Sequence, residues 1–580
     1  MAKDSRKPAG TRTLLDEMAH WTGIVGQMQQ LLMEHGATAA LRIGDDALAA
    51  MAKAADIDSA ELIEAQSAWW KEALAVWQSF LPLVPDDAVR ASQDRRFKDA
   101  RWQEPIFDMI RQSYVAIADQ LLQGVDAIEG LDHKQKEQLR FATQSFVEAM
   151  SPANFAFTNP AVLQRIFETR GANLLTGLER MLEDIQRGQI RHVGDNAFEV
   201  GRNLATTPGK VIKETPLYQL IHYAPTTETV KATPLIIFPP WINRFYILDL
   251  SPQKSFVRWA VDQGLSVFLV SWKSADASMA DTTMADYVLR GQRDAIDTVR
   301  DLLGVPSVHA IGYCVAGTAL AMLLAWLAAK GEADKVASAT FFTAQIDFSE
   351  AGDLALFVDD AQLGLIESLA TDGYLDGRYM AATFNLLRGR DLIWNYVVNN
   401  YLLAEDYVPF DLLYWNSDVT NLPAGWHTHY LADLYRDNLL VRPGAFHLEG
   451  VPIDLRPVKT PAYIQAGRED HIAPPESVWK MTGHFGGEQR FVLAGSGHIA
   501  GVINPPAAGK YQYWTNEAGA DSLAGFLAGA TEHKGSWWPD WIAWIKARSG
   551  GEVPAKRARI PGKGKLKPIE DAPGRYVRMR

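Results

Sequence analysis

The pattern of hydrophobic positions differs between the first 200 residues and the rest of the chain. Up to about residue 200, apolar residues recur at helical spacing, and hardly any stretch is typical of a strand. Two series at seven-residue spacing form a broad apolar stripe: Leu62, Trp69 and Val76, and Ile63, Trp70 and Trp77. Such a stripe usually packs into a core, and docking of a partner or a hydrophobic particle is the alternative. We therefore expect a helical N-terminal domain over residues 1–200.

From about residue 215, short β-branched runs alternate with segments of helical length. The runs cover residues 235–240, 266–272, 307–314, 338–347, 462–470 and 490–498. Helix-length segments such as residues 287–304 separate them, which indicates βαβ units and a mostly parallel sheet. The runs are almost continuously apolar, as in a sheet that helices cover on both faces. The pattern predicts an α/β domain over residues 201–580.

One segment interrupts this alternation, at about residues 350–450. It follows the fourth predicted strand, is rich in Tyr, Trp and Asp, and has a helical pattern. A plain loop of this length is uncommon in a compact domain. An insertion at this point would lie over the carboxyl ends of the strands, so we expect a cap or lid there.

Composition narrows the class of protein. The chain has 580 residues, of which 47% are hydrophobic and 22% charged, and it has a single cysteine, Cys314. The length predicts more than one domain, and the hydrophobic content excludes wholesale disorder. One cysteine excludes an internal disulfide and every zinc site that needs a pair of cysteines. The lone thiol is therefore either an inert buried side chain or a nucleophile.

No stretch of the chain has the length of a membrane span. The N-terminus lacks the apolar stretch of a signal peptide, and the longest nearly apolar run, residues 315–329, has 15 residues. A spanning helix needs about 20 residues. We therefore expect a cytoplasmic protein with no membrane span.

The net charge of −12 is unevenly distributed. Residues 556–580 carry +7, which leaves −19 on the remainder of the chain. A basic tail on an acidic body can contact nucleic acid, an anionic surface or the body itself, although such tails are usually solvated. The acidic body argues against a nucleic-acid enzyme, and we expect no nucleic-acid partner.

The cysteine lies between a predicted strand and a predicted helix, in the sequence GYCVAG at residues 312–317. This is the context of the nucleophile elbow G-x-S-x-G, with Cys in place of Ser. Strand and helix approach closely at such a turn, so small residues are needed on either side, and Gly312 and Ala316 meet that need. The helix N-terminus favours a thiolate at Cys314. The amide of Val315 is expected to point at the developing oxyanion.

Two further residues complete the order of an α/β-hydrolase triad, which runs nucleophile, acid, base. Asp470 ends the predicted strand 462–470, and His498 follows the next predicted strand. An acyl-cysteine is a thioester and stays activated toward another nucleophile, so a cysteine favours acyl transfer over hydrolysis when water is excluded. The predicted cap would exclude water from the site.

Other histidines among the 13 in the chain fit the role of the base less well. His309 lies inside a predicted strand, as packing residues do. His471 is adjacent to Asp470, and neighbouring residues cannot easily pair as acid and base. His427 and His429 form an H-x-H pair in the cap without supporting carboxylates, so we expect no metal site there.

At these residues the chain closely resembles the polyhydroxyalkanoate synthases. The resemblance covers roughly residues 70–580 and rests on PPWINRFY (239–246), GYCVAGT (312–318), DLLYWNSDVTNLP (411–423), GREDHIAP (467–474), GSGHIAGVINPP (495–506) and GSWWPDWIAWIKARSG (535–550). The full length and the VAGT continuation are most similar to the class I enzymes, which use one type of subunit and short-chain (R)-3-hydroxyacyl-CoA. Family members usually have Gly where this chain has Ala316.

The resemblance implies an α/β-hydrolase fold and an acyltransferase that polymerises (R)-3-hydroxyacyl-CoA, with 3-hydroxybutyryl-CoA as the expected substrate. CoA would be released, and no metal or organic cofactor would be needed. Cys314 would take the acyl group, and His498 would be the general base. Asp470 would orient His498, or activate the incoming hydroxyl. We expect a homodimer at the surface of cytoplasmic polyester granules, where the helical N-terminal domain contacts granule-associated proteins or the second subunit.

Two further positions follow from the resemblance. A second oxyanion donor is expected in the loop after residues 235–240. Pro239 and Pro240 have no N–H, so the donor lies at Trp241 or beyond, and we assign it to Ile242. Trp415 matches a family position linked with activity and dimer contact, and it could equally be part of the cap core.

Two other functions remain open. The same fold could carry a cysteine-type thioesterase or a polyester depolymerase. A non-catalytic granule or scaffold protein with a decayed hydrolase fold is the third reading. The three triad positions, Cys314, Asp470 and His498, are all filled in the correct order, which argues against the third.

Overall fold

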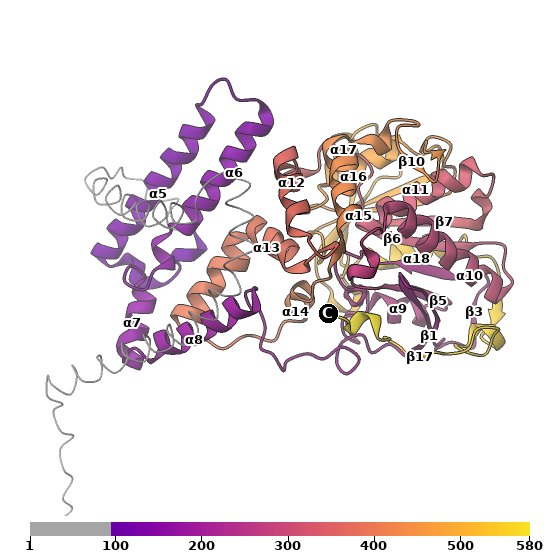
Figure 1. The fold of residues 1–580 in the computed structure, drawn as a ribbon, viewed down its shortest axis with the longest axis horizontal. Coiled ribbons are helices and arrows are strands. Elements are labelled where there is room, and N and C mark those ends of the chain that lie inside the picture. The colour runs from indigo at the N-terminus through magenta and orange to yellow at the C-terminus, as the bar shows by residue number, and fades with distance from the viewer. Residues whose placement is uncertain (1–93) are drawn as a thin grey trace, which may run out of the picture. The chain divides into compact units, whose positions relative to one another are not determined.

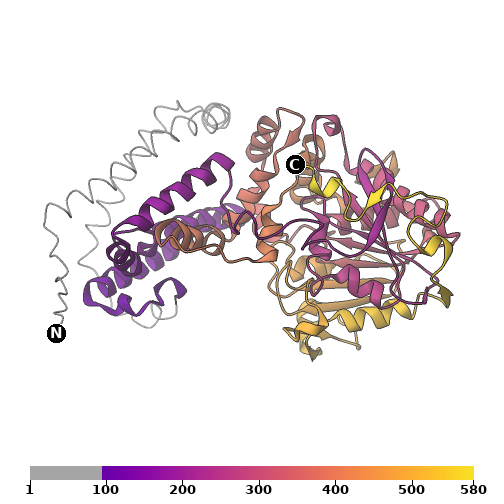
Figure 2. The same ribbon diagram turned by 90° about the horizontal axis from the view of Figure 1, so that it is seen from below.

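The computed structural model describes residues 94–580, which divide into two compact units. The first holds residues 94–194 together with Ala382–Val408, and the second holds Asp195–Ala381 together with Pro409–Arg580. Figures 1 and 2 show the chain as a ribbon from two directions. The apolar stripe at residues 62–77 lies outside the described residues.

The first unit is helical, as the apolar spacing predicts. Its longer N-terminal helices are α5 (Pro105–Asp126), α6 (His133–Ala149), α7 (Pro160–Thr169) and α8 (Ala172–Arg187). Local signals fix where they begin. Asp132 and Gln135 form a capping box at the start of α6. Asn159 caps α7, whose first residue is Pro160.

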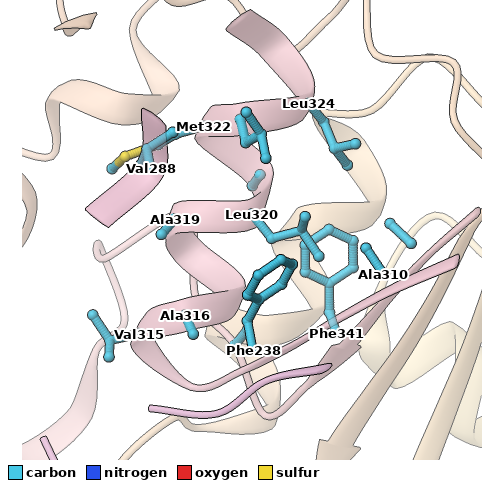
Figure 3. Packing of buried hydrophobic residues seen from close by; sticks show 14 of the residues in the cluster. Phe238, Val288, Ala310, Val315, Ala316, Ala319, Leu320, Met322, Leu324 and Phe341 are labelled. Atoms are coloured by element: carbon cyan, nitrogen blue, oxygen red, sulfur yellow. The ribbon is translucent and has the colours of Figure 1, made fainter. Parts of the chain in front are cut away.

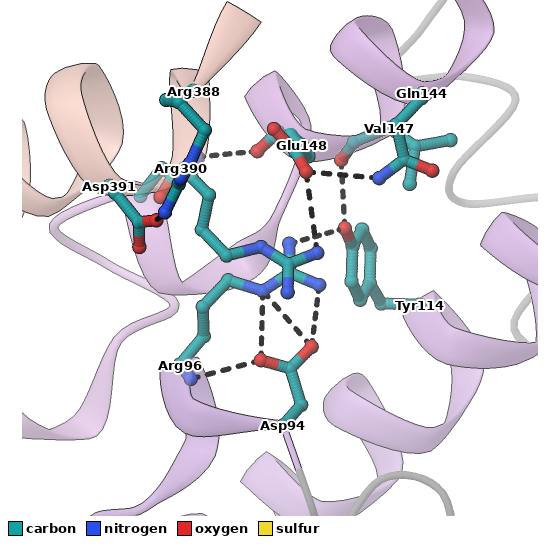
Figure 4. Close-up of polar contacts among 10 residues, drawn as sticks. Asp94, Arg96, Tyr114, Gln144, Val147, Glu148, Arg388, Arg390 and Asp391 are labelled. Atoms are coloured by element: carbon teal, nitrogen blue, oxygen red, sulfur yellow. Dashed lines mark hydrogen bonds and ion pairs between the residues drawn. The ribbon is translucent and has the colours of Figure 1, made fainter. Parts of the chain in front are cut away.

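The first unit also contains part of the predicted cap. Arg390 lies 3.3 Å from the carboxylate of Glu148 in α6, an ion pair drawn in Figure 4. Asn173 of α8 donates its side-chain amide to the carbonyl of Leu402 over 2.6 Å. These contacts join Ala382–Val408 to the N-terminal helices. The segment predicted as one cap over residues 350–450 is thus divided between the two units.

The second unit is built on an eleven-stranded sheet with the order β15-β14-β13-β12-β7-β6-β4-β5-β2-β1-β17. Its strands are β1 (Gly209–Glu214), β2 (Tyr218–Tyr223), β4 (Leu235–Phe238), β5 (Val267–Trp272), β6 (Val308–Tyr313), β7 (Val336–Phe342), β12 (Ala462–Gly467), β13 (Gln489–Ala494), β14 (Gln512–Thr515), β15 (Thr531–Lys534) and β17 (Glu570–Asp571). All six strands predicted from the apolar runs are present and adjacent.

The sheet is parallel only in its centre. The six predicted strands β5, β4, β6, β7, β12 and β13 pair in parallel. The strands at both edges pair antiparallel, so the expectation of a mostly parallel sheet is correct only for the centre. The reason is visible at β1 and β2. Only three residues, 215–217, connect them, and so short a connection joins antiparallel strands.

Helices cover both faces of this sheet, and each face has its own hydrophobic core. The helices are α9 (Phe256–Asp262), α10 (Asp294–Leu303), α11 (Val315–Ala329), α16 (Pro475–Trp479), α17 (Leu523–Ala528) and α18 (Trp538–Lys546). Figure 3 shows Leu320 of α11 beside the rings of Phe238 and Phe341. On the other face, Phe256 of α9 lies 5.1 Å, between ring centroids, from Trp538 of α18. Because α11 is apolar on all sides, it is buried from Val315 to Leu327.

The predicted helix at residues 287–304 is two elements. A π-helix over Asp286–Arg293 continues into α10.

The long insertion between β7 and β12 is mainly helical, as its pattern predicts. It contains α12 (Asp360–Leu369), α13 (Gly377–Leu387), α14 (Asp411–Ser417), α15 (Ala424–His429) and a π-helix over Tyr430–Arg436.

The basic C-terminal tail packs on the body of its own unit. Arg559 is buried and donates to the hydroxyl of Ser266 over 3.0 Å. The guanidinium of Arg580 lies 3.1 Å from the carboxylate of Asp418. Of the three contacts considered for this tail, the structure has the one with the protein itself. Within residues 94–580, no helix combines the length and the apolar character needed to cross a bilayer.

Candidate active site

Cys314 lies at the sharp turn between β6 and α11. Its φ of 53° lies in a region that residues other than glycine rarely adopt. The turn is held by backbone bonds: the N–H of Cys314 donates to Phe342 of β7 over 2.9 Å, and its carbonyl accepts the N–H of Gly317 over 2.8 Å. Cys314 is the N-cap residue of α11, so the helix dipole favours a thiolate at this position.

Two glycines allow strand and helix to meet. A Cβ on Gly312 would lie 2.5 Å from the Cα of Gly317, and a Cβ on Gly317 would lie 2.4 Å from the Cβ of Ala344. The closest approach therefore falls at Gly317, which the motif did not single out. Ala316 is fully buried in the core, and its carbonyl accepts a bond from Gln292 over 2.8 Å. The chain thus accommodates alanine at position 316.

Asp470 and His498 meet at the carboxyl ends of β12 and β13. The Nδ1 of His498 lies 2.7 Å from an oxygen of Asp470, and both residues are buried. The other oxygen of Asp470 accepts the N–H groups of Ile472 and Ala473, each over 2.9 Å. The hydroxyl of Tyr313 donates to the carbonyl of His498 over 3.0 Å. The carboxylate of Asp470 and the imidazole of His498 are thus both held in place. The Nε2 of His498 is the ring nitrogen that remains to take up or give a proton.

Opposing effects act on the protonation of His498. Burial alone would lower its pKa, but the negative charges of Asp470 and of the Cys314 thiolate, with hydrogen bonds to both, raise the pKa to about 10. The structure therefore places His498 in reach of both the acid and the nucleophile that the sequence predicts. This arrangement favours the charged imidazolium form of His498 beside the sulfur of Cys314.

The predicted oxyanion donors lie at the same edge of the sheet as the cysteine. Val315 is the first residue of α11, where the amide has no acceptor within the helix. Strands β4 and β6 are parallel neighbours, with Phe238 opposite Gly312. Ile242 comes four residues after Phe238, in the loop that leaves the carboxyl end of β4. The register therefore brings the start of the loop that contains Ile242 to the edge where Cys314 lies, and the role of its amide stays a prediction.

Trp415 is part of the core and also contacts this loop. Its side chain is buried in α14, and its indole N–H donates to the carbonyl of Arg244 over 2.6 Å. The structure thus agrees with a core position for Trp415, and the link with activity and dimer contact stays a prediction.

Two tyrosines near the sulfur were not identified from the sequence. Tyr430 and Tyr435 come from the π-helix Tyr430–Arg436, and their ring centroids lie 5.6 Å apart. Burial is the main cause that raises the pKa of both hydroxyls, and the charge of Cys314 adds to it in each. No motif distinguishes them from the other aromatic residues of the insertion, since their position depends on how the insertion folds over the sheet.

Three other histidines considered from the sequence have different surroundings. His309 is fully buried and bonded to Ser338 over 2.7 Å, which confirms its role in packing. His427 is buried in α15, and burial lowers its pKa to about 4. His429 contacts the carbonyl of Gly425 over 2.7 Å. Within the described part of the chain, no three His, Cys, Asp or Glu side chains are grouped as metal ligands.

The parallel centre of the sheet, the turn after β6 and the Asp–His pair after β12 and β13 define the α/β-hydrolase class of proteins. The model of the α/β hydrolase fold matches residues 252–505. The model described as the N-terminus of poly-beta-hydroxybutyrate polymerase (PhaC) matches residues 93–260. Together the two models span most of the chain.

Individual relatives agree with this assignment. The chain is 44% identical to the poly(3-hydroxyalkanoate) polymerase subunit PhaC of Rhizobium meliloti, over 90% of this chain and 86% of the relative. It is 42% identical to the PhaC subunit of Cupriavidus necator, over 99% and 96% respectively. It is 37% identical to poly(3-hydroxyalkanoate) polymerase 2 of Ectopseudomonas oleovorans, over 86% and 88%. The chain belongs to the poly(3-hydroxyalkanoate) polymerase family, a family of acyltransferases, which confirms the resemblance.

Proposed function

We propose that this protein polymerises (R)-3-hydroxyacyl groups from CoA thioesters into a polyester and releases CoA. The observation that carries the proposal is the 2.7 Å contact between Asp470 and the imidazole of His498. The charge of Cys314, the only thiol of the chain, acts on the same imidazole. Family membership supports the same reaction. The proposed steps use side chains and backbone groups of the chain itself.

In the first step, the thiolate of Cys314 attacks the carbonyl carbon of the acyl-CoA thioester. The amides of Val315 and Ile242 stabilise the oxyanion that forms. The bond to the CoA sulfur then breaks, and His498 gives its proton to the leaving thiolate. The products are free CoA and an acyl group bound to Cys314 as a thioester.

In the second step, the 3-hydroxyl of another hydroxyacyl group attacks this thioester. His498, now neutral, takes the hydroxyl proton, an ester bond forms, and the bond to the sulfur of Cys314 breaks. The thiolate and the imidazolium are thereby restored. Asp470 orients His498 and stabilises its charged form. Direct activation of the hydroxyl by Asp470 is the alternative division of roles.

The substrate preference and the assembly belong to the same proposal. We assign short-chain substrates, above all 3-hydroxybutyryl-CoA, because the chain resembles the class I enzymes. A homodimer is proposed as well. The single cysteine offers no second covalent site, so two acyl groups held on cysteines at once would require two subunits.

The proposed location of the enzyme follows from the low solubility of its product. A growing polyester is insoluble in water, so the enzyme would work at the surface of cytoplasmic granules. The helical N-terminal region would contact the granule, granule-associated proteins or the second subunit. The exposed apolar side chains Phe157 and Phe167 in the described part of that region are compatible with such contacts.

Product analysis tests the proposed function. Purified protein is given (R)-3-hydroxybutyryl-CoA, and free CoA, polymer and free hydroxy acid are measured. Polymer that forms with equivalent release of CoA is the expected result. Soluble hydroxy acid without polymer would instead assign the protein as a thioesterase or depolymerase. No release of CoA would favour a non-catalytic granule protein.

A further inference from the structure

The loop after β4, which carries the proposed oxyanion donor, is held through its backbone carbonyls. Three side chains donate to these carbonyls: Trp272 to Pro239 over 2.8 Å, Thr420 to Trp241 over 2.7 Å, and Trp415 to Arg244 over 2.6 Å. The first donor comes from β5, and the other two come from the insertion between β7 and β12. The insertion therefore takes part in fixing the shape of this loop.

The bond to Trp241 bears directly on the oxyanion donor. The carbonyl of Trp241 and the amide of Ile242 belong to one peptide unit. This peptide is trans, and a trans peptide is planar with its C=O and N–H pointing in opposite directions. A donor that fixes the direction of the C=O therefore also fixes the direction of the N–H. Thr420 binds the side of the peptide that lies away from the N–H of Ile242.

Thr420 is itself held firmly. Its side chain is buried, and the next residue, Asn421, donates its backbone N–H to the hydroxyl of Ser274 over 3.0 Å. The side-chain amide of Asn421 also donates to the carbonyl of Ala275 over 3.2 Å. A Cβ on Gly377 would lie 2.4 Å from the carbonyl oxygen of Thr420, so the backbone is tightly packed there. The hydroxyl of Thr420 is thus presented from a fixed backbone.

The residues before Thr420 brace the same loop. Val419 forms a β-bridge with Asn243 and accepts a bond at its carbonyl from Arg244 over 3.0 Å. Asp418 lies 3.4 Å from Arg244 and 3.1 Å from the C-terminal residue, Arg580. These contacts keep the two segments in register, so the distance between Thr420 and the Trp241 carbonyl is set by several independent bonds.

We propose that Thr420 is a positioning residue for the oxyanion hole, and that it aims the N–H of Ile242 at the acyl carbonyl carried by Cys314. This inference rests on the proposed function. The hydroxyl acts in two ways. It fixes the peptide, and its bond to the C=O polarises the peptide, which strengthens the N–H as a donor. The insertion thereby supplies a residue that reaches the chemistry only through the backbone of another loop.

Thr420→Val tests the proposal, because valine keeps the shape of threonine and removes the donor. We expect the rate of CoA release in a single turnover, and kcat, to fall about tenfold, since loss of a whole oxyanion donor costs about 100-fold or more. The KM for the acyl-CoA is expected to stay the same, because the oxyanion bond strengthens only in the transition state. Thr420→Ser retains the hydroxyl and should restore the wild-type rate.

Alkylation of the sole cysteine by iodoacetamide provides the internal control. This reaction needs the thiolate but forms no oxyanion, so the Thr420→Val protein should be alkylated at the wild-type rate. The matched control is Thr482→Val, since Thr482 also donates to a backbone carbonyl, that of Trp479, over 2.7 Å. This control should leave both reactions unchanged. Thr420→Ala removes the same donor and serves if the valine variant does not fold.

Wild-type CoA release by a folded Thr420→Val protein would overturn the positioning role. An equal loss of acylation and alkylation would also overturn it, because it would mean that the whole site has lost its structure. Absence of CoA release by the wild-type protein would instead overturn the proposed function, and this inference with it. Loss of acylation alone, with rescue by serine, supports the proposal.

Discussion

At the scale of single residues, the charge balance around His498 controls the candidate site. The imidazole is buried, which disfavours its charged form, yet the Asp470 carboxylate and the sulfur of Cys314 raise its pKa to about 10. A base with a raised pKa keeps its proton to a higher pH. The imidazole of His498 is therefore in its charged form at neutral pH, beside the sulfur of Cys314.

Removing the charge of Asp470 should weaken this pair. Asp470→Asn keeps the size of the side chain, but the pKa of His498 should fall, because its main favourable charge is lost. The balance between the thiolate–imidazolium pair and the uncharged thiol–imidazole pair then shifts toward the uncharged pair, by about tenfold for each pKa unit. We therefore expect alkylation of Cys314 by iodoacetamide at pH 7 to slow. Rates between pH 6 and 9 measure the effect. Asp454→Asn is the control, because the carboxylate of Asp454 is paired with Arg456. Identical pH profiles of alkylation for the Asp470 variant and the wild type would contradict the account.

A second prediction at this scale concerns the close approach of Gly317 at the turn that holds Cys314. Gly317→Ala brings a methyl group within 2.4 Å of Ala344, so it should destabilise the fold by about 1–3 kcal/mol and lower activity. Ala316→Gly creates no such clash and should retain the turn. Thermal melting and CoA release distinguish the two. Equal behaviour of the two variants would mean that the close approach at Gly317 is not what shapes the turn.

At the scale of elements, α11 begins directly after Cys314, so its packing against the sheet bears on the position of the candidate nucleophile. Leu320 of α11 is fully buried and lies beside the rings of Phe238 in β4 and Phe341 in β7 (Figure 3). Truncation there removes packing on which the start of the helix depends. The site is therefore coupled to the stability of the sheet below it.

Leu320→Ala should lower the free energy of unfolding by about 2–5 kcal/mol, as truncations of buried leucines do. Urea unfolding at equilibrium measures it. Leu527→Ala is the matched control, because Leu527 of α17 is 42% exposed, and its effect should stay within about 0.5 kcal/mol. A similar shift for the two variants would contradict the assignment of α11 to the core.

The same elements show what the sequence could predict. The central strands and α11 are almost continuous apolar runs, so the hydrophobic pattern alone predicts them. The motif around Cys314 is recognised because it lies between one such strand and the helix that follows. The edge strand β15 is largely exposed and has no apolar pattern, so it could not be located. The grouping of Ala382–Val408 with the N-terminal helices, the tyrosines at 430 and 435, and the bond from Thr420 depend on contacts between distant segments. No local pattern encodes such contacts.

At the scale of the whole molecule, buried histidines make stability depend on pH. Burial lowers the pKa of His427 and of His309 to about 4 and that of His222 to about 3. In the unfolded chain these groups take up protons near pH 6.5. As pH falls from 6.5 toward 4, the unfolded state therefore gains protons that the folded state does not, and stability decreases.

His427 isolates this effect, since its buried Nδ1 is without a hydrogen-bond partner in the described structure. His427→Leu removes the titrating group, so the loss of stability between pH 7 and pH 4.5 should be smaller than in the wild type by about 2–3 kcal/mol. Urea unfolding at the two pH values measures the difference. If both proteins lose the same stability, His427 does not remain neutral in the folded state.

The central claim concerns the covalent role of Cys314, and trapping of the acyl enzyme tests it most directly. The protein is mixed with radiolabelled (R)-3-hydroxybutyryl-CoA, quenched in acid and digested, and the labelled peptide is sequenced. The account predicts label on the peptide that contains Cys314, release of that label by hydroxylamine, and none in Cys314→Ala. Label on another residue, or polymer made by the Cys314→Ala protein, would contradict it.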